Sequence, residues 1–143
     1  MNRRILRGVL AGALLALTPA LAACSSGEDA PAAAVAAVAF DGAHVSSDAF
    51  AAAVAEDGVT VVDVRTPAEF AEGHLPDAVN IDVSDPGFAD AVAALDPDAE
   101  YAVYCRSGNR SRAAIDQMTA GGVAHTVGLE GGIGAWGGEV VTG

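Results

Sequence analysis

The 143-residue sequence contains no lysine and only two cysteines, and each shortage excludes a class of protein. Seven arginines stand against 19 acidic residues, which gives a formal net charge of -12. Such a chain repels a phosphate backbone, so nucleic acid is excluded as a partner. Two cysteines without a cluster of cysteine and histidine exclude a disulfide scaffold and a zinc module, and we expect no bound metal. The length allows one domain with tails but not two domains.

The longest apolar run, residues 8–17, is too short to cross a bilayer, and it follows a basic segment at residues 1–7. Leu21-Ala22-Ala23-Cys24 comes next, and the whole segment resembles a bacterial lipoprotein signal, which is cleaved before its cysteine. The resemblance implies that residues 1–23 are removed and that lipid on Cys24 anchors the protein to the extracytoplasmic face of the cell membrane. The alternative is an ordinary signal peptide that leaves Cys24 as a free thiol. An arginine pair in the basic segment leaves both the general secretory route and the twin-arginine route open.

Small and alanine-rich residues fill the segment 24–39, which predicts a flexible tether between the lipid and a domain at residues 40–143. A short alanine helix is the alternative for this segment. Removal of the signal would leave four arginines in the chain, and three of them lie within residues 106–112. Positive charge concentrated in one short segment of an acidic protein predicts an anion-binding site there.

Strand-like and helix-like patterns alternate through residues 40–143, which predicts one α/β domain. Apolar runs at 59–64 and 101–104 are typical of buried strands, and shorter strands are expected at 78–81 and 125–127. Repeated strand–helix units favour a mainly parallel sheet with helices on both faces. Helix starts are expected at Ser46–Asp48, at Thr66–Pro67 with Glu69 completing a capping box, at Asp85–Pro86 and at Ser111.

A polar loop, Cys105-Arg106-Ser107-Gly108-Asn109-Arg110, joins the buried strand at 101–104 to the next expected helix. Such a loop can turn several backbone N–H groups inward, and the helix N-terminus adds positive potential. Both effects favour thiolate, so we expect Cys105 to be an exposed nucleophile with a lowered pKa, open to oxidation. Gly108 allows the backbone angles that such a loop needs. The alternative is a buried, inert cysteine with the arginines facing solvent.

Four segments in this order resemble the single-domain rhodanese family, and together they span about residues 40–141. They are Asp63-Val64-Arg65-Thr66-Pro67-Ala68-Glu69-Phe70, Gly73-His74-Leu75-Pro76-Asp77-Ala78-Val79-Asn80-Ile81, Cys105 to Arg110, and Gly131-Gly132-Ile133-Gly134-Ala135-Trp136. Asp77 stands where the family commonly has glycine. The resemblance implies a three-layer α/β/α domain around a mainly parallel five-stranded sheet.

The same resemblance implies a two-step sulfur transfer without a metal or organic cofactor. Cys105 would take sulfur from a small anionic donor such as thiosulfate, and a thiol, cyanide or protein acceptor would remove it. Backbone amides from Ser107 to Arg110 would stabilise the charged persulfide. Arg106 and Arg110 would hold the donor, although Arg110 could instead bind carbonyl groups of the loop.

Four residues separate Cys105 from Arg110, as in sulfurtransferases of this type. Related phosphatases and arsenate reductases have five, so the shorter loop favours sulfur transfer over either of those reactions. The main alternative is a sulfur-carrier or redox-sensing module whose Cys105 persulfide is read by a partner protein.

Other polar residues near the loop are expected to support the fold. We expect Arg65 and Glu69 to form a structural ion pair near the site and Asp63 to fix a loop at the end of its strand. The remaining assignments are His44 and His125 as strand residues, His74 in a turn and Trp136 as a packing anchor.

Overall fold

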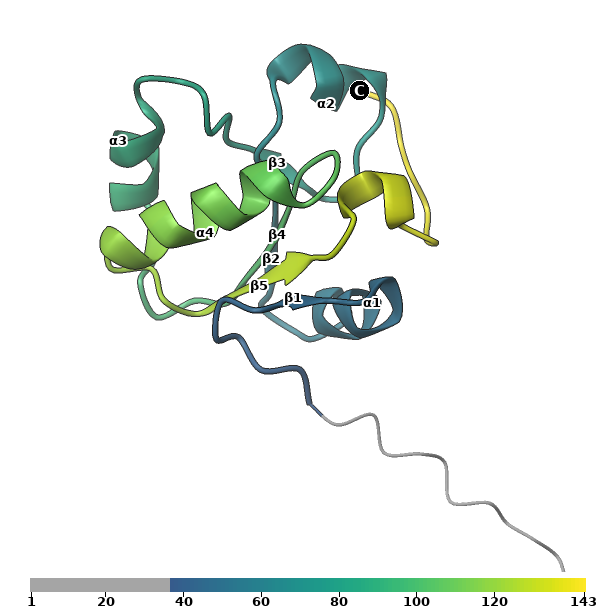
Figure 1. Ribbon diagram of the computed structural model, residues 1–143, viewed down its shortest axis with the longest axis horizontal. Coiled ribbons are helices and arrows are strands. Elements are labelled where there is room, and N and C mark those ends of the chain that lie inside the picture. Colours follow the sequence, from purple (N-terminus) through teal and green to yellow (C-terminus); the bar gives the residue numbers. More distant parts are fainter. Residues whose placement is uncertain (1–36) are drawn as a thin grey trace, which may run out of the picture. The chain divides into compact units, whose positions relative to one another are not determined.

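The computed structural model describes residues 37–143, so the expected signal segment, Cys24 and most of the expected tether lie outside the described residues. A single five-stranded sheet, with the order β1-β5-β4-β2-β3, forms the centre of the domain (Figure 1). All four strand pairings are parallel, which confirms the expected parallel sheet. The strands are β1 (His44–Val45), β2 (Thr60–Asp63), β3 (Val79–Asn80), β4 (Tyr101–Tyr104) and β5 (Thr126–Leu129).

Helices cover both faces of the sheet, as the three-layer expectation requires. Figure 1 shows α3 and α4 on one face and α1 on the other, and the two buried clusters agree with this arrangement. The helices are α1 (Ser47–Val54), α2 (Pro67–Glu72), α3 (Phe88–Ala93) and α4 (Asn109–Ala120), followed by a short 3-10 turn, η1 (Gly132–Ala135). No helix within residues 37–143 is both long and apolar enough to cross a membrane.

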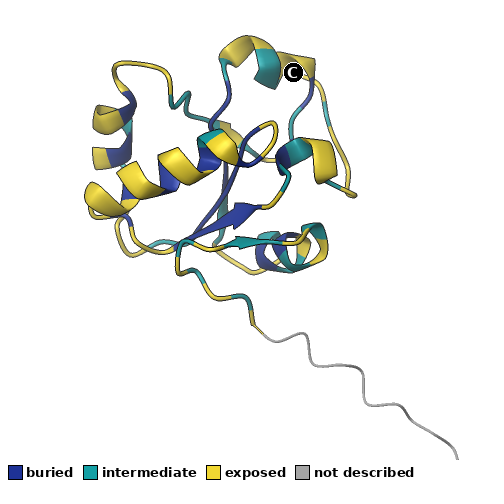
Figure 2. Ribbon diagram, viewed as in Figure 1, coloured by how far each residue is buried: buried dark blue, intermediate teal, exposed yellow. Residues whose placement is uncertain are grey.

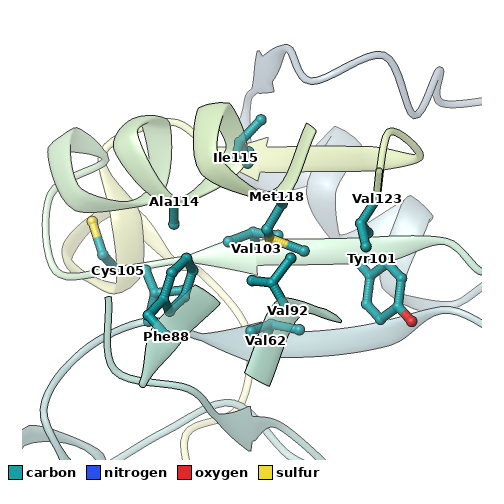
Figure 3. Close-up of a cluster of buried hydrophobic side chains, with 11 residues drawn as sticks. Val62, Phe88, Val92, Tyr101, Val103, Cys105, Ala114, Ile115, Met118 and Val123 are labelled. Atoms are coloured by element: carbon teal, nitrogen blue, oxygen red, sulfur yellow. The ribbon is translucent and has the colours of Figure 1, made fainter. Parts of the chain in front are cut away.

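Strand β4 divides the core, because successive side chains of a strand point to opposite faces. Tyr101, Val103 and Cys105 pack in the cluster beneath α3 and α4, whereas Ala102 and Tyr104 pack in the cluster beneath α1. Every residue of β4 and of β5 is buried, as Figure 2 shows by colour. Cys105 follows β4 directly and lies at the edge of the first of these clusters (Figure 3).

One helix start has the expected capping box, whereas two other helices begin at positions that differ from the expected ones. The hydroxyl of Thr66 accepts a hydrogen bond from the Glu69 amide and the Glu69 carboxylate accepts one from the Thr66 amide, so the expected capping box is present. Helix α3 begins at Phe88 rather than at 85–86, because the Asp85 carboxylate accepts from the Gly87 amide at 2.7 Å and holds a turn there. Helix α4 begins at Asn109, two residues before the expected start.

Asp77 is the one non-glycine residue within residues 37–143 with a positive φ, 58°. This backbone conformation is the one that glycine adopts without cost, and Asp tolerates it better than most residues. Asp77 therefore adopts a backbone angle that the glycine common at this position in the family would also adopt.

Candidate active site

The sulfur of Cys105 lies at the N-terminus of α4. The backbone amide of Gly108 donates a hydrogen bond to Cys105 Sγ at 3.1 Å. Gly108 is the N-cap residue of α4, has a φ of 93° and supplies no side-chain cap. The cysteine sulfur therefore occupies the place of a capping oxygen, where orphan N–H groups and the helix dipole favour negative charge.

Hydrogen bonds lower the pKa of the Cys105 thiol although the residue is buried. Burial is the largest single influence and raises the pKa. The backbone and hydroxyl of Ser111 and the backbone amides of Ser107 and Gly108 act in the opposite direction and together outweigh it. The expectation of a lowered pKa is therefore confirmed, with hydrogen bonds as its cause.

The expected exposure of the thiol is wrong, because Cys105 is 0% exposed. Figure 3 shows it at the end of the apolar cluster, with its sulfur beside the loop and not among the labelled aliphatic side chains. Burial under the loop keeps bulky oxidants away from the sulfur in this conformation. Burial alone is also what an inert core cysteine would show, so the hydrogen bonds to the sulfur are the observations that speak against the inert alternative.

The glycine-rich segment after β5 holds the outer side of the active loop. The Ile133 amide donates to the Cys105 carbonyl at 2.8 Å, and the Gly134 amide donates to the Arg106 carbonyl at 3.3 Å. Gly132 has a φ of 61°, and a Cβ atom built on it would lie 2.4 Å from the Cys105 carbonyl oxygen. A side chain at 132 is thus excluded both by the backbone angle and by the closeness of the loop.

Arg110 points to α2 and forms a two-bond ion pair with Glu69. Its Nη1 and Nη2 atoms lie 2.7 Å from Glu69 Oε2 and Oε1, respectively. In this conformation Arg110 holds neither the loop carbonyls nor an open anion site, the two roles expected for it. The pair instead clamps the active loop to α2, with the planar guanidinium matching the carboxylate.

The expected ion pair between Arg65 and Glu69 is wrong, because Arg65 pairs with Asp63. Arg65 Nε lies 2.9 Å from Asp63 Oδ1, and Arg65 Nη2 donates to the Gly73 carbonyl at 2.7 Å. The spacing of four residues suits a pair on one helix, but α2 begins at Pro67, so Arg65 lies before the helix. Asp63 is fully buried and also accepts from the Arg65 amide, so the expected role of Asp63 in fixing the strand end is confirmed.

Arg106 is the loop arginine that remains available to an anion. Its side chain is exposed, and within residues 37–143 its guanidinium has no hydrogen-bond or ion-pair partner. It borders a hollow of about 230 Å³ between the active loop, α2 and η1. The residues that line this hollow are Arg65, Glu69, Glu72, Arg106, Ile133 and Gly134.

Two residues near the sulfur were not expected there, Ser111 and His44. Ser111 is fully buried, its Oγ lies 3.7 Å from Cys105 Sγ, and His44 Nε2 lies 2.8 Å from the same Oγ. A hydroxyl in the first turn of the helix after the loop is a signal that could have revealed Ser111. Nothing in the sequence pattern links His44 to Cys105 or to Ser111. His44 was expected only as a strand residue, and it lies on β1.

The remaining assignments agree with the structure in most respects. Asn109 is exposed at the first position of α4. His74 follows the end of α2, and its Nδ1 lies 2.9 Å from the Phe70 carbonyl oxygen. Trp136 packs edge-on against Phe50, with ring centroids 5.9 Å apart. His125 precedes β5 rather than lying on it.

Comparison with known proteins assigns this fold and loop to one family. A model of the rhodanese-like domain matches residues 46–139. The chain belongs to the rhodanese family. The stretch that matches includes β2, the capping box of α2, the active loop and the glycine-rich segment after β5.

Curated relatives of this rhodanese are named as sulfurtransferases. It is 38% identical over 81 residues to "Thiosulfate sulfurtransferase GlpE" of Pseudomonas aeruginosa, which covers 57% of this chain and 72% of that protein. It is 36% identical over 80 residues to "Sulfurtransferase" of Allochromatium vinosum, which covers 56% of this chain and 73% of that one. The chain is therefore an enzyme of the rhodanese sulfurtransferase class.

Solved structures agree with the fold. A rhodanese-related protein from Thermoplasma volcanium superposes with a TM-score of 0.60 at 33% identity, covering 68% of this chain and 96% of that one. A rhodanese-like domain protein from Staphylococcus aureus superposes with a TM-score of 0.61 at 28% identity, covering 70% and 97%. The three-layer architecture expected from the sequence is thus shown by independent structures.

Replacing Gly132 with alanine should disrupt the active loop. The new Cβ would collide with the Cys105 carbonyl and force a strained backbone angle, so the free energy of unfolding should fall by about 2 kcal/mol or more. Urea unfolding measures this loss. Gly134→Ala is the matched control, since its Cβ would lie 3.4 Å from the Arg106 carbonyl and needs no positive φ. Equal stability of the two variants would contradict this account of the segment.

Replacing Glu69 with glutamine should destabilise the protein at neutral pH but not in strong acid. The hydrogen bonds from Arg110 hold the pKa of Glu69 at about 2, below its ordinary value of 4.5. The ionised pair therefore stabilises the fold above about pH 4.5, and this contribution disappears as the pH falls through about 2. Glutamine can still complete the capping box, so the loss near pH 7 should be about 1 kcal/mol for this partly exposed pair. Urea unfolding near pH 7 and near pH 2 tests this, and an equal loss at both would refute the pairing.

Proposed function

We propose that this rhodanese transfers sulfane sulfur from thiosulfate, or from a related persulfide donor, to a thiophilic acceptor through a persulfide on Cys105. The observation that carries the proposal is the Cys105 sulfur itself, with its lowered pKa and its hydrogen bond from the Gly108 amide. The thiosulfate in the name of the Pseudomonas aeruginosa relative supports the choice of donor.

In the first step, the Cys105 thiolate attacks the outer sulfur of thiosulfate. A new S–S bond forms at Cys105 Sγ, the S–S bond of thiosulfate breaks, and sulfite leaves with the bonding electron pair. The persulfide then carries a negative charge on its terminal sulfur. The amides of Ser107 and Gly108 and the first turn of α4 lie where they can stabilise this charge, as donors of an oxyanion hole do.

In the second step, the acceptor attacks the terminal sulfur of the persulfide. The bond to Cys105 Sγ breaks, and Cys105 leaves as the thiolate that the loop already stabilises. With cyanide as the acceptor the product is thiocyanate, and with a thiolate it is a new persulfide. Neither step needs an external electron or a cofactor to balance it.

A carrier or sensing module is the second candidate, and the complete burial of Cys105 favours it. A covered persulfide would resist small thiols until a partner protein opened the loop. The phosphatase and arsenate reductase readings are weaker, because only four residues separate Cys105 from Arg110. Arg110 is also paired with Glu69 instead of pointing at a tetrahedral anion.

We also propose that the enzyme acts outside the cytoplasm, anchored to the cell membrane by lipid on Cys24. The Leu-Ala-Ala-Cys sequence at 21–24 supports this location. A tethered site of this kind would meet donors and acceptors at the membrane surface, where a small anion, a thiol or a partner protein could reach it.

Thiocyanate release from thiosulfate and cyanide tests the proposed reaction. We expect turnover by the reduced protein and none by Cys105→Ser, whereas Cys24→Ser, the matched control for loss of a thiol, should keep its turnover. Mass spectrometry after thiosulfate treatment should show one added sulfur atom, absent from Cys105→Ser. A persulfide that forms but does not turn over with small acceptors would instead support the carrier module.

Replacing Arg106 with glutamine should weaken binding of thiosulfate. Loss of one partly exposed charge contact costs about 1 kcal/mol, so KM should rise about fivefold with little change in kcat. Steady-state kinetics of thiocyanate formation provides the measurement. Arg112→Gln is the comparison, because Arg112 belongs to the same basic segment but its Nη1 donates to the Gly108 carbonyl and it does not line the hollow beside Arg106. An equal rise in KM for both variants would show that only the general field of the arginines matters.

A further inference from the structure

A chain of three side chains runs from the edge strand β1 to the catalytic sulfur. His44 Nε2 lies 2.8 Å from Ser111 Oγ, and Ser111 Oγ lies 3.7 Å from Cys105 Sγ. His44 lies on β1, Ser111 lies in the first turn of α4, and Cys105 follows β4 directly. Ser111 and Cys105 are fully buried, and His44 is partly buried. His44 is therefore the member of this chain that is in contact with solvent.

The space for the His44 ring is provided by a glycine on the neighbouring strand. His44 pairs with Gly128 across β1 and β5. A Cβ atom built on Gly128 would lie 2.3 to 2.5 Å from three atoms of the imidazole. Gly128 is not among the described glycines with positive φ, so its backbone does not itself require glycine. The missing side chain at 128 therefore allows the imidazole to cross β5 and reach Ser111.

The hydrogen bonds around Ser111 determine which group donates. Ser111 has one hydroxyl proton, and it donates that proton to the Gly108 carbonyl at 3.0 Å. The short contact with His44 then requires the Nε2–H of the imidazole as donor. Arg112 Nη1 also donates to the Gly108 carbonyl, at 3.3 Å, so this carbonyl keeps a partner if the hydroxyl turns away.

We propose that His44 is a positioning residue for Cys105: its Nε2–H holds the Ser111 hydroxyl so that the hydroxyl proton can turn from the Gly108 carbonyl to the sulfur when Cys105 ionises. A hydroxyl that accepts from His44 is a better donor to the thiolate, because hydrogen bonds in series polarise one another. The chemical role of this thiolate rests on the proposed sulfur transfer, whereas the hydrogen-bond chain stands independently of it.

The surroundings of His44 keep its ring neutral, as a donor through one nitrogen. Burial and then Arg112 lower the pKa of His44, and Glu130 and Asp116 raise it by less. Arg112 and Asp116 lie on α4, and Glu130 follows β5 directly. A hollow of about 390 Å³ borders the ring and lets it exchange protons with solvent, and it is lined by Gly42, Ala43, His44, Arg112, Ile115 and Asp116.

The pH dependence of Cys105 alkylation by iodoacetamide tests the proposal. In full-length protein carrying Cys24→Ser, Cys105 is the only thiol. His44→Phe keeps a ring over Gly128 but removes the donor, and we expect the thiol pKa to rise by about half a unit, a roughly threefold slower reaction below the pKa. His44→Gln restores an N–H donor at a similar position and should restore most of the rate. His125→Phe, at an exposed histidine, is the matched control and should leave the thiol pKa unchanged.

Two further variants make the test independent of one substitution. Ser111→Ala should raise the thiol pKa more than His44→Phe, and His44→Phe should then add nothing, because the chain is already broken. Gly128→Ala should displace the imidazole and raise the thiol pKa without removing any hydrogen-bonding group. An unchanged or lower thiol pKa in folded His44→Phe and Gly128→Ala would overturn the proposal. Alkylation needs no sulfur transfer, so failure of the enzyme assay alone would refute the proposed reaction and leave this result standing.

Discussion

The hydrogen bond from the Gly108 amide to the Cys105 sulfur is the interaction on which the site depends. Helix α4 needs an acceptor at its N-terminus, and its N-cap glycine has no side chain to supply one. The sulfur needs donors to remain ionised in a buried position. The sulfur is the acceptor that the helix needs, and the helix N–H groups are the donors that the sulfur needs. The start of the helix and the reactivity of the thiol therefore depend on the same few atoms. The positive φ of Gly108 and the absence of a side chain at Gly132 both serve to bring the loop into this position.

The proposed anion site lies in a strongly acidic protein, with a formal net charge of -12. The three arginines at 106–112 contribute less free charge than their number implies, because Arg110 is neutralised by Glu69. Hydrogen bonds from backbone amides and from Ser111 are the main stabilising influences on the thiolate instead. Such bonds act over a few ångströms and are poorly screened by salt, whereas the field of exposed arginines is screened within about 10 Å at 0.1 M ionic strength. Arg106 and Arg112 form no ion pair within residues 37–143, and of these two Arg106 borders the hollow beside the loop, where we propose that the anionic donor binds.

Features that depend on neighbouring residues could be predicted from the sequence. Contacts between side chains that are far apart in the sequence could not. The capping box at Thr66 and Glu69, the buried strand before Cys105 and the parallel order of the sheet follow from nearby residues, and all were predicted. The ion pairs were not, because Glu69 and Arg110 are 41 residues apart and their pairing depends on how α2 lies beside the loop. The expected pair of Arg65 with Glu69 was wrong, because Arg65 lies before α2 and its guanidinium bonds Asp63, two residues earlier. His44 and Ser111 are 67 residues apart, and only the closeness of β1 to α4 brings them together.

The edge position of β1 explains how a fully buried sulfur can still be connected to solvent. A central strand carries neighbours on both sides, and its side chains are covered by helices, as in β4. Strand β1 has a neighbour on one side only, so a polar side chain on it can face water while reaching inward over a glycine. His44 uses this position with one ring nitrogen toward Ser111, and Gly128 leaves room for the ring, because a Cβ atom at 128 would collide with the imidazole. In this chain the cysteine therefore has two distinct sides: the side beside Arg106 and η1, where we propose that substrate binds, and the side where a hydrogen-bond chain from the sheet edge reaches the sulfur through the first turn of α4.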